Sequence, residues 1–234
     1  MSNLRSFLAG AAVCALISAS ACNLHAATIL KLDLGNIGPD LQMTGGFLGT
    51  VSDSIPGTTG DQNTSIEYTG FLDPIPDVNT PIASFTLTGL SRSGDAVVSG
   101  SLVLQDFSGG TLELYDAFNT LLLSGTLAAS NLQGTIGPPG TGAVLTTNFA
   151  TVTGGVLFDF IVPGSLTVSM GLTGVNGGNG LSVTGNTLNP FQAESVVNID
   201  ALPTPTGANF PEPGSFLLAA MALSAGTAVR RRTC

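Results

Sequence analysis

The residue types that most often carry catalysis are scarce between the two ends of this sequence. The only histidine is His25, and the three cysteines are Cys14, Cys22 and Cys234. The segment 28–201 therefore has neither an imidazole nor a thiol, which excludes Ser-His and Cys-His nucleophiles and histidine-ligated metals there. It also has no disulfide, so its stability must come from its core or from bound ions.

Carboxylates are the remaining candidates for catalysis. A glycosidase needs two of them facing each other across a cleft. Four acidic residues of the middle segment are candidates for such a pair: Asp106, Glu113, Asp116 and Asp159. No spacing marks two of them as partners, and we interpret Glu113 and Asp116 as outward strand and turn residues that keep the protein soluble. The sequence therefore predicts a protein without a catalytic site.

Loop carboxylates are also ligands for hard cations. Asp73, Asp77 and Asn79, with nearby backbone carbonyls, are the candidates for a Ca²⁺ site. Pro74 and Pro76 interrupt this run and no glutamate follows at EF-hand spacing, so we interpret these residues as solvated turns. The sequence predicts no cofactor and no metal ligands, with Ca²⁺ as an open alternative.

Sugar binding is a second open alternative for a chain of this composition. Sugar platforms use aromatic faces, and this chain has no tryptophan and only two tyrosines, Tyr68 and Tyr115. We interpret the phenylalanines at alternating strand positions as core residues. A secreted polysaccharide-binding module, with or without calcium, is nevertheless kept as the alternative function.

The charge of the chain argues against nucleic acid as a partner. The formal net charge is −9, and Lys31 and Arg92 are the only basic residues between positions 28 and 211. They face fourteen acidic residues, the chain's fifteen less Glu212, so this segment carries a charge of −12. Such a surface repels phosphate backbones.

Short runs of alternating apolar and polar residues recur from Thr28 to Asp200. One example is ASFTLTGL, in which Phe85 and Leu87 share one face and two threonines share the other. A longer example is GSLVLQDFSGGTLELYDAFNTLLLSGTL, which reads as three strands joined by turns at Gly109-Gly110 and at 117–120. A period of two with glycine at the turns favours antiparallel hairpins.

About ten such strands predict an all-β fold for residues 28–201, an antiparallel, jelly-roll-like β-sandwich. The run TILKLDL places Ile29 on the face opposite Leu30, Leu32 and Leu34. Further strands are expected in AVLTTNFATVTGG, VLFDFIV, SLTVSMGLTGV, GLSVTG and SVVNIDAL. Loops are expected in LDPIPDVNTPIA and LQGTIGPPGTG, and residues 202–210 read as an extended linker.

Residues 1–27 have the three regions of a secretory signal peptide. Arg5 supplies the positive n-region, an apolar h-region covers 7–19, and small residues precede Thr28. This pattern predicts export through the Sec translocon and cleavage by signal peptidase after residue 26 or 27. The alternatives are a buried N-terminal helix and a lipoprotein signal that ends at Cys22.

The last 24 residues combine three features in a fixed order. An extended Pro211-Glu212-Pro213 segment comes first, residues 215–229 follow without a charge, and Arg230, Arg231 and Arg232 come next. As a helix, the uncharged run would span about 23 Å. The positive-inside rule would hold the arginines in the cytoplasm and leave the acidic bulk outside. We therefore expect a short transmembrane helix, with a simple tail anchor or a buried C-terminal helix as the alternatives.

This arrangement at 211–234 resembles the PEP-CTERM sorting signal of exported proteins from exopolysaccharide-producing bacteria. The resemblance implies that a membrane-embedded exosortase recognises Pro211, Glu212 and Pro213, while Arg230 to Arg232 set the topology. It also implies cleavage near this motif, followed by release or attachment at the cell surface. We therefore expect a surface or extracellular-matrix protein of structural or adhesive role, held only transiently in the inner membrane.

Overall fold

The computed structural model describes residues 26–35, 38–51, 61–72, 82–138 and 142–204. All of these residues belong to one unit, Ala26–Thr204. Pro211 to Pro213, Arg230 to Arg232 and the calcium candidates at positions 73, 77 and 79 lie outside the described residues. Among the residues that are described, no helix has the length and apolar character needed to cross a membrane.

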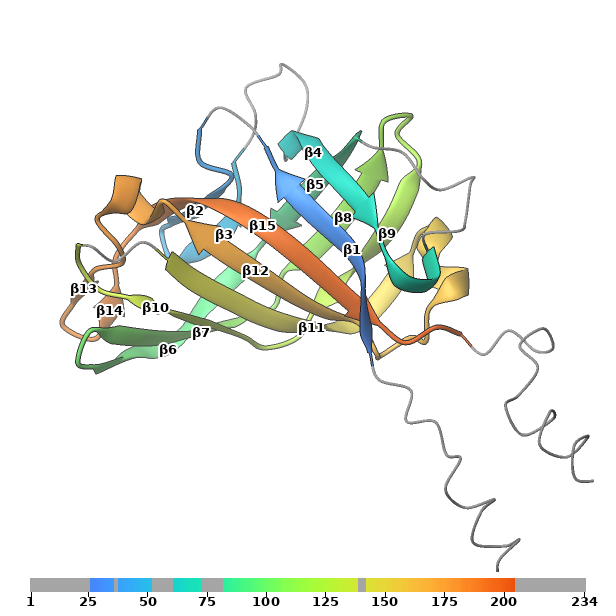
Figure 1. The fold of residues 1–234 in the computed structure, drawn as a ribbon. Coiled ribbons are helices and arrows are strands. Elements are labelled where there is room, and N and C mark those ends of the chain that lie inside the picture. Colours follow the sequence, from blue (N-terminus) through green and yellow to red (C-terminus); the bar gives the residue numbers. More distant parts are fainter. Residues whose placement is uncertain (1–25, 36–37, 52–60, 73–81, 139–141, 205–234) are drawn as a thin grey trace, which may run out of the picture. The chain divides into compact units, whose positions relative to one another are not determined.

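Strands dominate the described part of the chain, as the alternating pattern predicts. There, thirteen strands form one large antiparallel sheet and two form a separate hairpin (Figure 1). The large sheet contains β1 (Ala27–Leu34), β2 (Leu41–Thr44), β3 (Phe47–Thr50), β4 (Asp61–Tyr68), β5 (Ile82–Thr88), β6 (Leu90–Ser99), β7 (Leu102–Ser108), β8 (Thr111–Asp116), β9 (Leu121–Leu127), β10 (Ser130–Thr135), β11 (Gly142–Gly154), β12 (Thr167–Thr173) and β15 (Phe191–Ala201). The hairpin consists of β13 (Val183–Thr184) and β14 (Thr187–Leu188), and the short 3-10 segments are η1 (Gly70–Leu72), η2 (Val156–Phe160) and η3 (Val175–Gly178). The expected all-β, antiparallel fold is confirmed.

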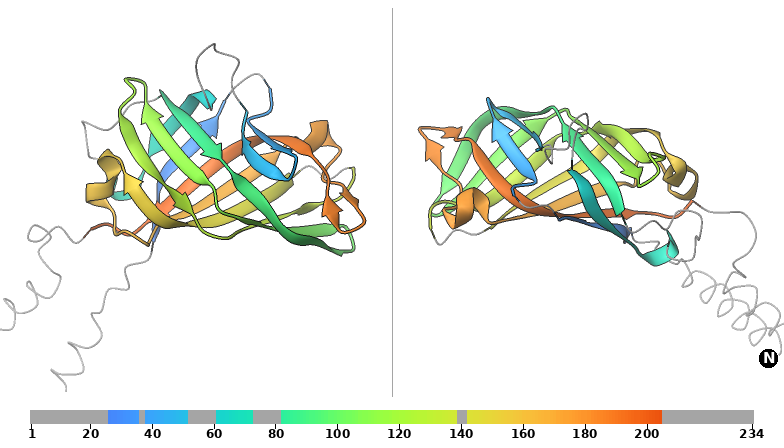
Figure 2. Two further views of the ribbon diagram at one scale, coloured as in Figure 1. Left: turned by 180° about the vertical axis from the view of Figure 1, so that it is seen from behind. Right: turned by 90° about the horizontal axis from the view of Figure 1, so that it is seen from above.

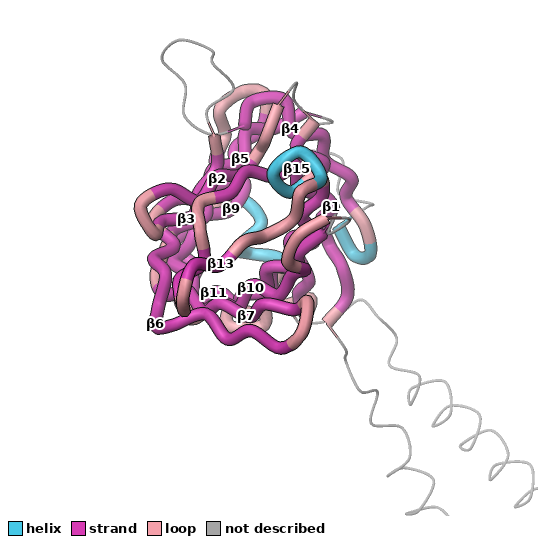
Figure 3. The backbone as a smooth tube through the Cα atoms, turned by 90° about the vertical axis from the view of Figure 1, so that its left-hand side faces the viewer, coloured by secondary structure: helices cyan, strands magenta, loops and turns pink. Residues whose placement is uncertain are grey.

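The large sheet closes on itself. Its strands are hydrogen-bonded in the order β1-β4-β5-β8-β9-β11-β10-β7-β6-β3-β2-β15-β12, with further pairings between β1 and β15 and between β11 and β12. Each of these thirteen strands therefore has at least two neighbours, and Figure 3 shows them surrounding the interior of the domain. Because an unpaired edge strand can add another chain, closure protects the sheet from unwanted association.

Three strands, β11, β12 and β15, belong to both halves of this closed sheet. One half continues through β1, β4, β5, β8 and β9, and the other through β10, β7, β6, β3 and β2. Along one edge, β11 pairs with β10 at residues 143–146 and with β9 at residues 149–154, while β12 pairs along the other edge. In the same way, β15 pairs with β2 at 191–193 and with β1 at 196–201. Both views in Figure 2 show these strands running along the domain. The sheet therefore branches at two places: β10 and β9 separate along β11, and β2 and β1 separate along β15.

The core lies inside the closed sheet and follows the alternation of the strands. Phe85 and Leu87 are buried and Thr88 is exposed, as the sequence pattern predicts. Ile29, which was expected opposite Leu30, is also buried, because the register of β1 shifts between Thr28 and Leu30. Each large apolar side chain buried in this way contributes about 1.5–3 kcal/mol.

Two further local expectations from the sequence are wrong. VLFDFIV, expected as a strand, forms η2 because the chain turns at Gly155, where φ is 115°, and Leu157 packs into the core. LQGTIGPPGTG, expected as a loop, begins within β10, because Leu132 and Gly134 fill inward positions between β7 and β11. Both differences arise from packing against distant strands.

The buried carboxylate of Asp40 bonds to β15 at the place where this strand changes its neighbour from β2 to β1. Ser195 lies between the residues that pair with β2 and those that pair with β1. Its backbone N–H donates to Asp40 Oδ2 at 2.5 Å, and Asp40 is only 2% exposed. The backbone of Asp40 also bonds to Ala193 and Val51. Asp40 therefore supplies the acceptor that neither neighbouring strand offers to Ser195.

Replacing Asp40 by alanine should lower the free energy of unfolding by about 1–3 kcal/mol, the cost of leaving a buried donor without an acceptor. Asp40→Asn retains an acceptor oxygen and should lose less. Urea unfolding of the purified full chain, followed by far-ultraviolet circular dichroism, measures the difference. Asp33→Ala removes an exposed carboxylate from β1 and serves as the control. Equal stability of D40A and D33A would contradict the bridging role.

Candidate binding site

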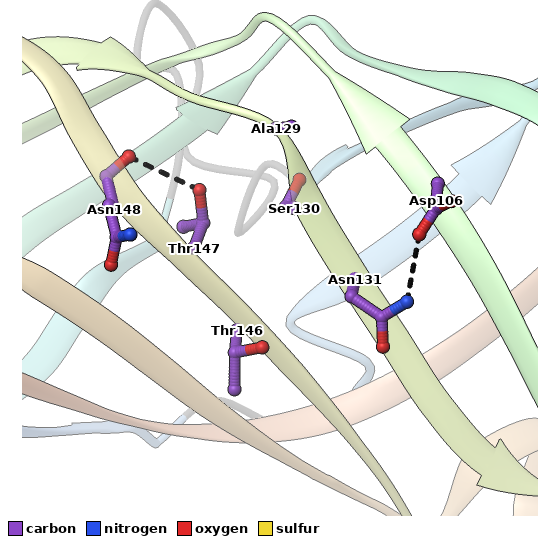
Figure 4. Close-up of a pocket in the computed structure, with 7 residues that line it drawn as sticks. All are labelled: Asp106, Ala129, Ser130, Asn131, Thr146, Thr147 and Asn148. Carbon is purple, nitrogen blue, oxygen red and sulfur yellow. Dashed lines mark hydrogen bonds between the residues drawn. The ribbon is translucent and has the colours of Figure 1, made fainter.

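A notch opens on the outer face of the sheet beside β7, β10 and β11 (Figure 4). Its volume is about 250 Å³. The notch is lined by Asp106, Ala129, Ser130, Asn131, Thr146, Thr147 and Asn148. All of these except Ala129 carry a side chain that can form hydrogen bonds. The site is therefore polar, and its chemistry is that of carboxylate, amide and hydroxyl groups.

The notch exists because β9 and β10 separate beside β11. β9 ends at Leu127 and β10 begins at Ser130. The N–H of Ala128 donates to Asn148 O at 2.8 Å, and the ladder between β10 and β11 begins with Asn131 and Thr146. Backbone pairing is interrupted between these two points, which opens the wall of the sheet there.

Three side chains on adjacent strands form the rim of the notch. Asp106, Asn131 and Thr146 are successive cross-strand neighbours on β7, β10 and β11. Asn131 Nδ2 donates to Asp106 Oδ1 at 2.8 Å, and this bond orients both groups (Figure 4). Within the described residues, the second carboxylate oxygen of Asp106 and the hydroxyl of Thr146 have no partner. These groups are free to accept or donate hydrogen bonds to a ligand.

Two further side chains lie deeper, at inward positions of their strands. The hydroxyl of Thr147 is buried, and its single hydrogen can be donated to the carbonyl of Asn148 at 3.3 Å or to that of Ala128 at 3.5 Å. Ser130 is 4% exposed, and its Oγ has no hydrogen-bond partner among the residues that the structure describes. A buried hydroxyl in that state costs about 1–3 kcal/mol. A bound group that reached Ser130 would offset this cost.

The other carboxylates considered from the sequence do not lie beside Asp106. Glu113 is exposed on β8, whose neighbours are β5 and β9, whereas β7 lies between β6 and β10. Asp116 accepts hydrogen bonds from two backbone N–H groups of the turn at 117–120, at 2.8 and 2.7 Å. Asp159 is exposed in η2. Glu113 and Asp116 are therefore strand and turn residues, as interpreted from the sequence.

The two basic residues of the domain have separate structural roles. Lys31 Nζ lies 3.2 Å from Glu67 Oε2 in an exposed ion pair, which contributes about 0–1 kcal/mol. Arg92 is half-buried, and its Nη1 donates to Leu188 O at 3.0 Å. Arg92 therefore fastens the β13–β14 hairpin to β6.

The aromatic side chains do not form one sugar-binding platform in the described part of the chain. Tyr68 is buried and Tyr115 is half-buried. The phenylalanines with the largest burial are Phe85, Phe107, Phe149 and Phe191, and the exposed ones are Phe47, Phe118 and Phe158. The exposed three belong to β3, the turn after β8 and η2. No aromatic side chain lines the notch described above.

No protein-family model, curated protein or solved structure matches this chain. The chemistry of the site therefore follows from its own side chains. Within the described ranges, no group of three or more His, Cys, Asp and Glu side chains gathers as a metal site would require. The single carboxylate of the notch, Asp106, stands among amide and hydroxyl groups, a set suited to hydrogen bonding with neutral polar ligands.

Sequence reasoning considered Asp106 but missed the residues around it. Asn131 and Thr146 are outward polar residues, which the alternating pattern treats as ordinary surface. Ser130 and Thr147 could have been found from the sequence. They are polar residues at the alternating strand positions that point inward, where apolar residues such as Leu145 are buried. A polar residue at an inward position indicates where the core is interrupted.

Proposed function

We propose that this chain is an exported, non-enzymatic protein of the cell surface or extracellular matrix, with a structural or adhesive role. An exosortase processes its C-terminal signal after export. The observation that carries this proposal is the order of Pro211-Glu212-Pro213, the uncharged run 215–229 and Arg230 to Arg232. In this proposal the mature domain is a jelly-roll-like sandwich between a signal peptide and a short transmembrane helix.

The first and last strands of the domain have their chain ends side by side, which supports attachment of the domain to the membrane or cell surface at that end. Ala27 and Ala201 are register partners on β1 and β15, so the first and last strands begin and end side by side. Figure 1 shows the β13–β14 hairpin and η3 at the opposite end of the domain. A domain held through Thr204 would present that opposite end to its surroundings. Its paired strands also suit a secreted domain that has no disulfide.

Expression of the full chain in a host with and without an exosortase system tests the proposal. Intact mass and C-terminal sequencing of the exported product should place the last residue near Pro213 only in the host that has the system. The double substitution P211A/P213A should abolish this cleavage while removal of residues 1–27 continues, because the extended recognition segment is lost.

Pro205→Ala is the matched control, since it removes a proline of the linker outside the motif. This variant should be processed like the unaltered chain. Retention of Arg230 to Arg232 in both hosts would identify an ordinary membrane anchor and refute the exosortase proposal.

A further inference from the structure

We propose that the notch beside β7, β10 and β11 binds a neutral sugar unit of an extracellular polysaccharide. This inference goes beyond the proposed function and does not depend on how the C-terminus is processed. It rests on the rim formed by Asp106 and Asn131, on the buried hydroxyl of Ser130, and on two rows of outward side chains that cross the sheet at the notch.

The rim presents hydrogen-bond acceptors in a fixed arrangement. The bond from Asn131 Nδ2 occupies Asp106 Oδ1, so the second carboxylate oxygen and the amide oxygen of Asn131 can still accept hydrogen bonds from a ligand. Neighbouring hydroxyls of a sugar can donate to these two oxygens together. Hydrogen bonds to a carboxylate are roughly twice as strong as those between neutral groups. Asp106 and the acidic segment around it repel anionic ligands, so a neutral sugar fits better than an acidic one.

Ser130 provides a second and independent reason to expect a ligand. Its Oγ is buried at the notch and has no partner among the described residues. A hydroxyl reaching into the notch could both donate to and accept from this group. A ligand hydroxyl that reached Ser130 would complete the hydrogen bonding of this buried group, whereas an apolar group would leave it without a partner.

Two parallel rows of outward side chains extend the notch across six strands, β6, β7, β10, β11, β12 and β15. The polar row, in register order, is Ser93, Asp106, Asn131, Thr146, Ser169 and Asn198. The adjacent row, two residues along each strand except at the bulge of β6, is Val97, Leu104, Gln133, Val144, Gly171 and Val196. A polar row therefore lies directly beside a mainly aliphatic one.

This pairing of rows matches the two sides of a polysaccharide chain. Sugar rings carry hydroxyls at their edges and C–H groups on their faces, so the edges can bond to the polar row while the faces contact Leu104 and Val144. Adjacent strands are about 4.8 Å apart, so a chain lying along the rows meets a new polar side chain at each strand. The rows therefore favour an extended polymer over a single free sugar.

A cation is a weaker match to the same residues. Ca²⁺ in proteins takes six to eight oxygen ligands, usually including several carboxylates. The notch offers one carboxylate, Asp106, and its first oxygen is already bonded to Asn131. The remaining groups are neutral amides and hydroxyls.

Affinity electrophoresis of the purified full chain in gels containing mannan, galactan, a β-glucan or alginate tests the inference. We expect retardation by at least one of the three neutral polymers and none by alginate, with or without a chelator. Asp106→Ala and Asn131→Ala should each weaken binding at least tenfold. Glu113→Ala, an exposed carboxylate on β8, should leave binding unchanged.

Ser130→Ala separates a binding role from a structural one. The substitution removes a buried hydroxyl without a partner, so thermal stability should stay equal or rise while binding to the neutral polymer weakens several-fold. Wild-type binding by both S130A and D106A, or no binding to any neutral polymer, would overturn the proposal. Binding that a chelator abolishes would assign the notch to a cation instead. A dimer that Val144→Asp disrupts would assign the rows to a second copy of the chain.

Discussion

Replacing Gly155 by alanine should strongly destabilise the domain. An alanine Cβ at this position would lie 2.3 Å from Leu122 O and 2.6 Å from Leu123 N. These are backbone atoms of β9, which cannot move aside as a flexible side chain can. The φ of Gly155 is 115°, a region that strains other residues. We expect a loss of about 1–3 kcal/mol from overpacking and a similar amount from backbone strain.

Gly164→Ala is the matched control for this substitution. Gly164 also has a positive φ, 85°, but nothing lies within 4 Å of the position its Cβ would take. It therefore reports the backbone strain without the overlap. Urea unfolding followed by circular dichroism compares the two variants, since the chain has no tryptophan to report by fluorescence. An equal loss in G155A and G164A would contradict the close packing of η2 against β9.

Replacing Phe85 by alanine should cost about 3–5 kcal/mol, the range for large-to-small changes in a close-packed core. Phe85 is fully buried on β5, opposite Leu114 of β8. Truncation removes apolar contacts and leaves a cavity that the paired strands on both sides can fill only partly. Since small domains have about 5–15 kcal/mol of stability, this single change should lower the unfolding midpoint markedly.

Phe118→Ala is the control for Phe85→Ala, because it removes the same side chain from a turn where it is 81% exposed. The loss there should stay within about 0.5 kcal/mol. The thermal midpoints of the two variants give the comparison. A loss in F118A as large as that in F85A would mean that the exposed phenylalanine is covered by another surface in solution.

Local signals in the sequence located many of the strands correctly. The stretch that contains β7, β8 and β9 has its turns at Gly109-Gly110 and at 117–120, where the structure also has them. Gly109 and Gly110 both have positive φ, which explains why glycine marks this turn. Alternation and turn residues act over a few positions, so they can be read from neighbouring residues alone.

The elements that the sequence misjudged depend on distant partners. Leu132 and Gln133 lie in a glycine- and proline-rich stretch that resembles a loop, yet β7 and β11 pair with them on both sides. Val156 to Phe160 have the composition of a strand, yet the turn at Gly155 places them against β9 as η2. Tertiary contacts outweighed local propensity in both places.

The sequence by itself determined the all-β character of the domain, its acidity and its lack of imidazole and thiol groups, because composition and a period of two are properties of neighbouring residues. Only the tertiary structure decided which strands pair, how the sheet closes, and that Asp106, Asn131 and Thr146 lie side by side. These residues are distant in sequence, and their proximity follows from the register of β7, β10 and β11. That register depends on burial summed over the whole sheet, because shifting a strand by one residue would turn its apolar face to water.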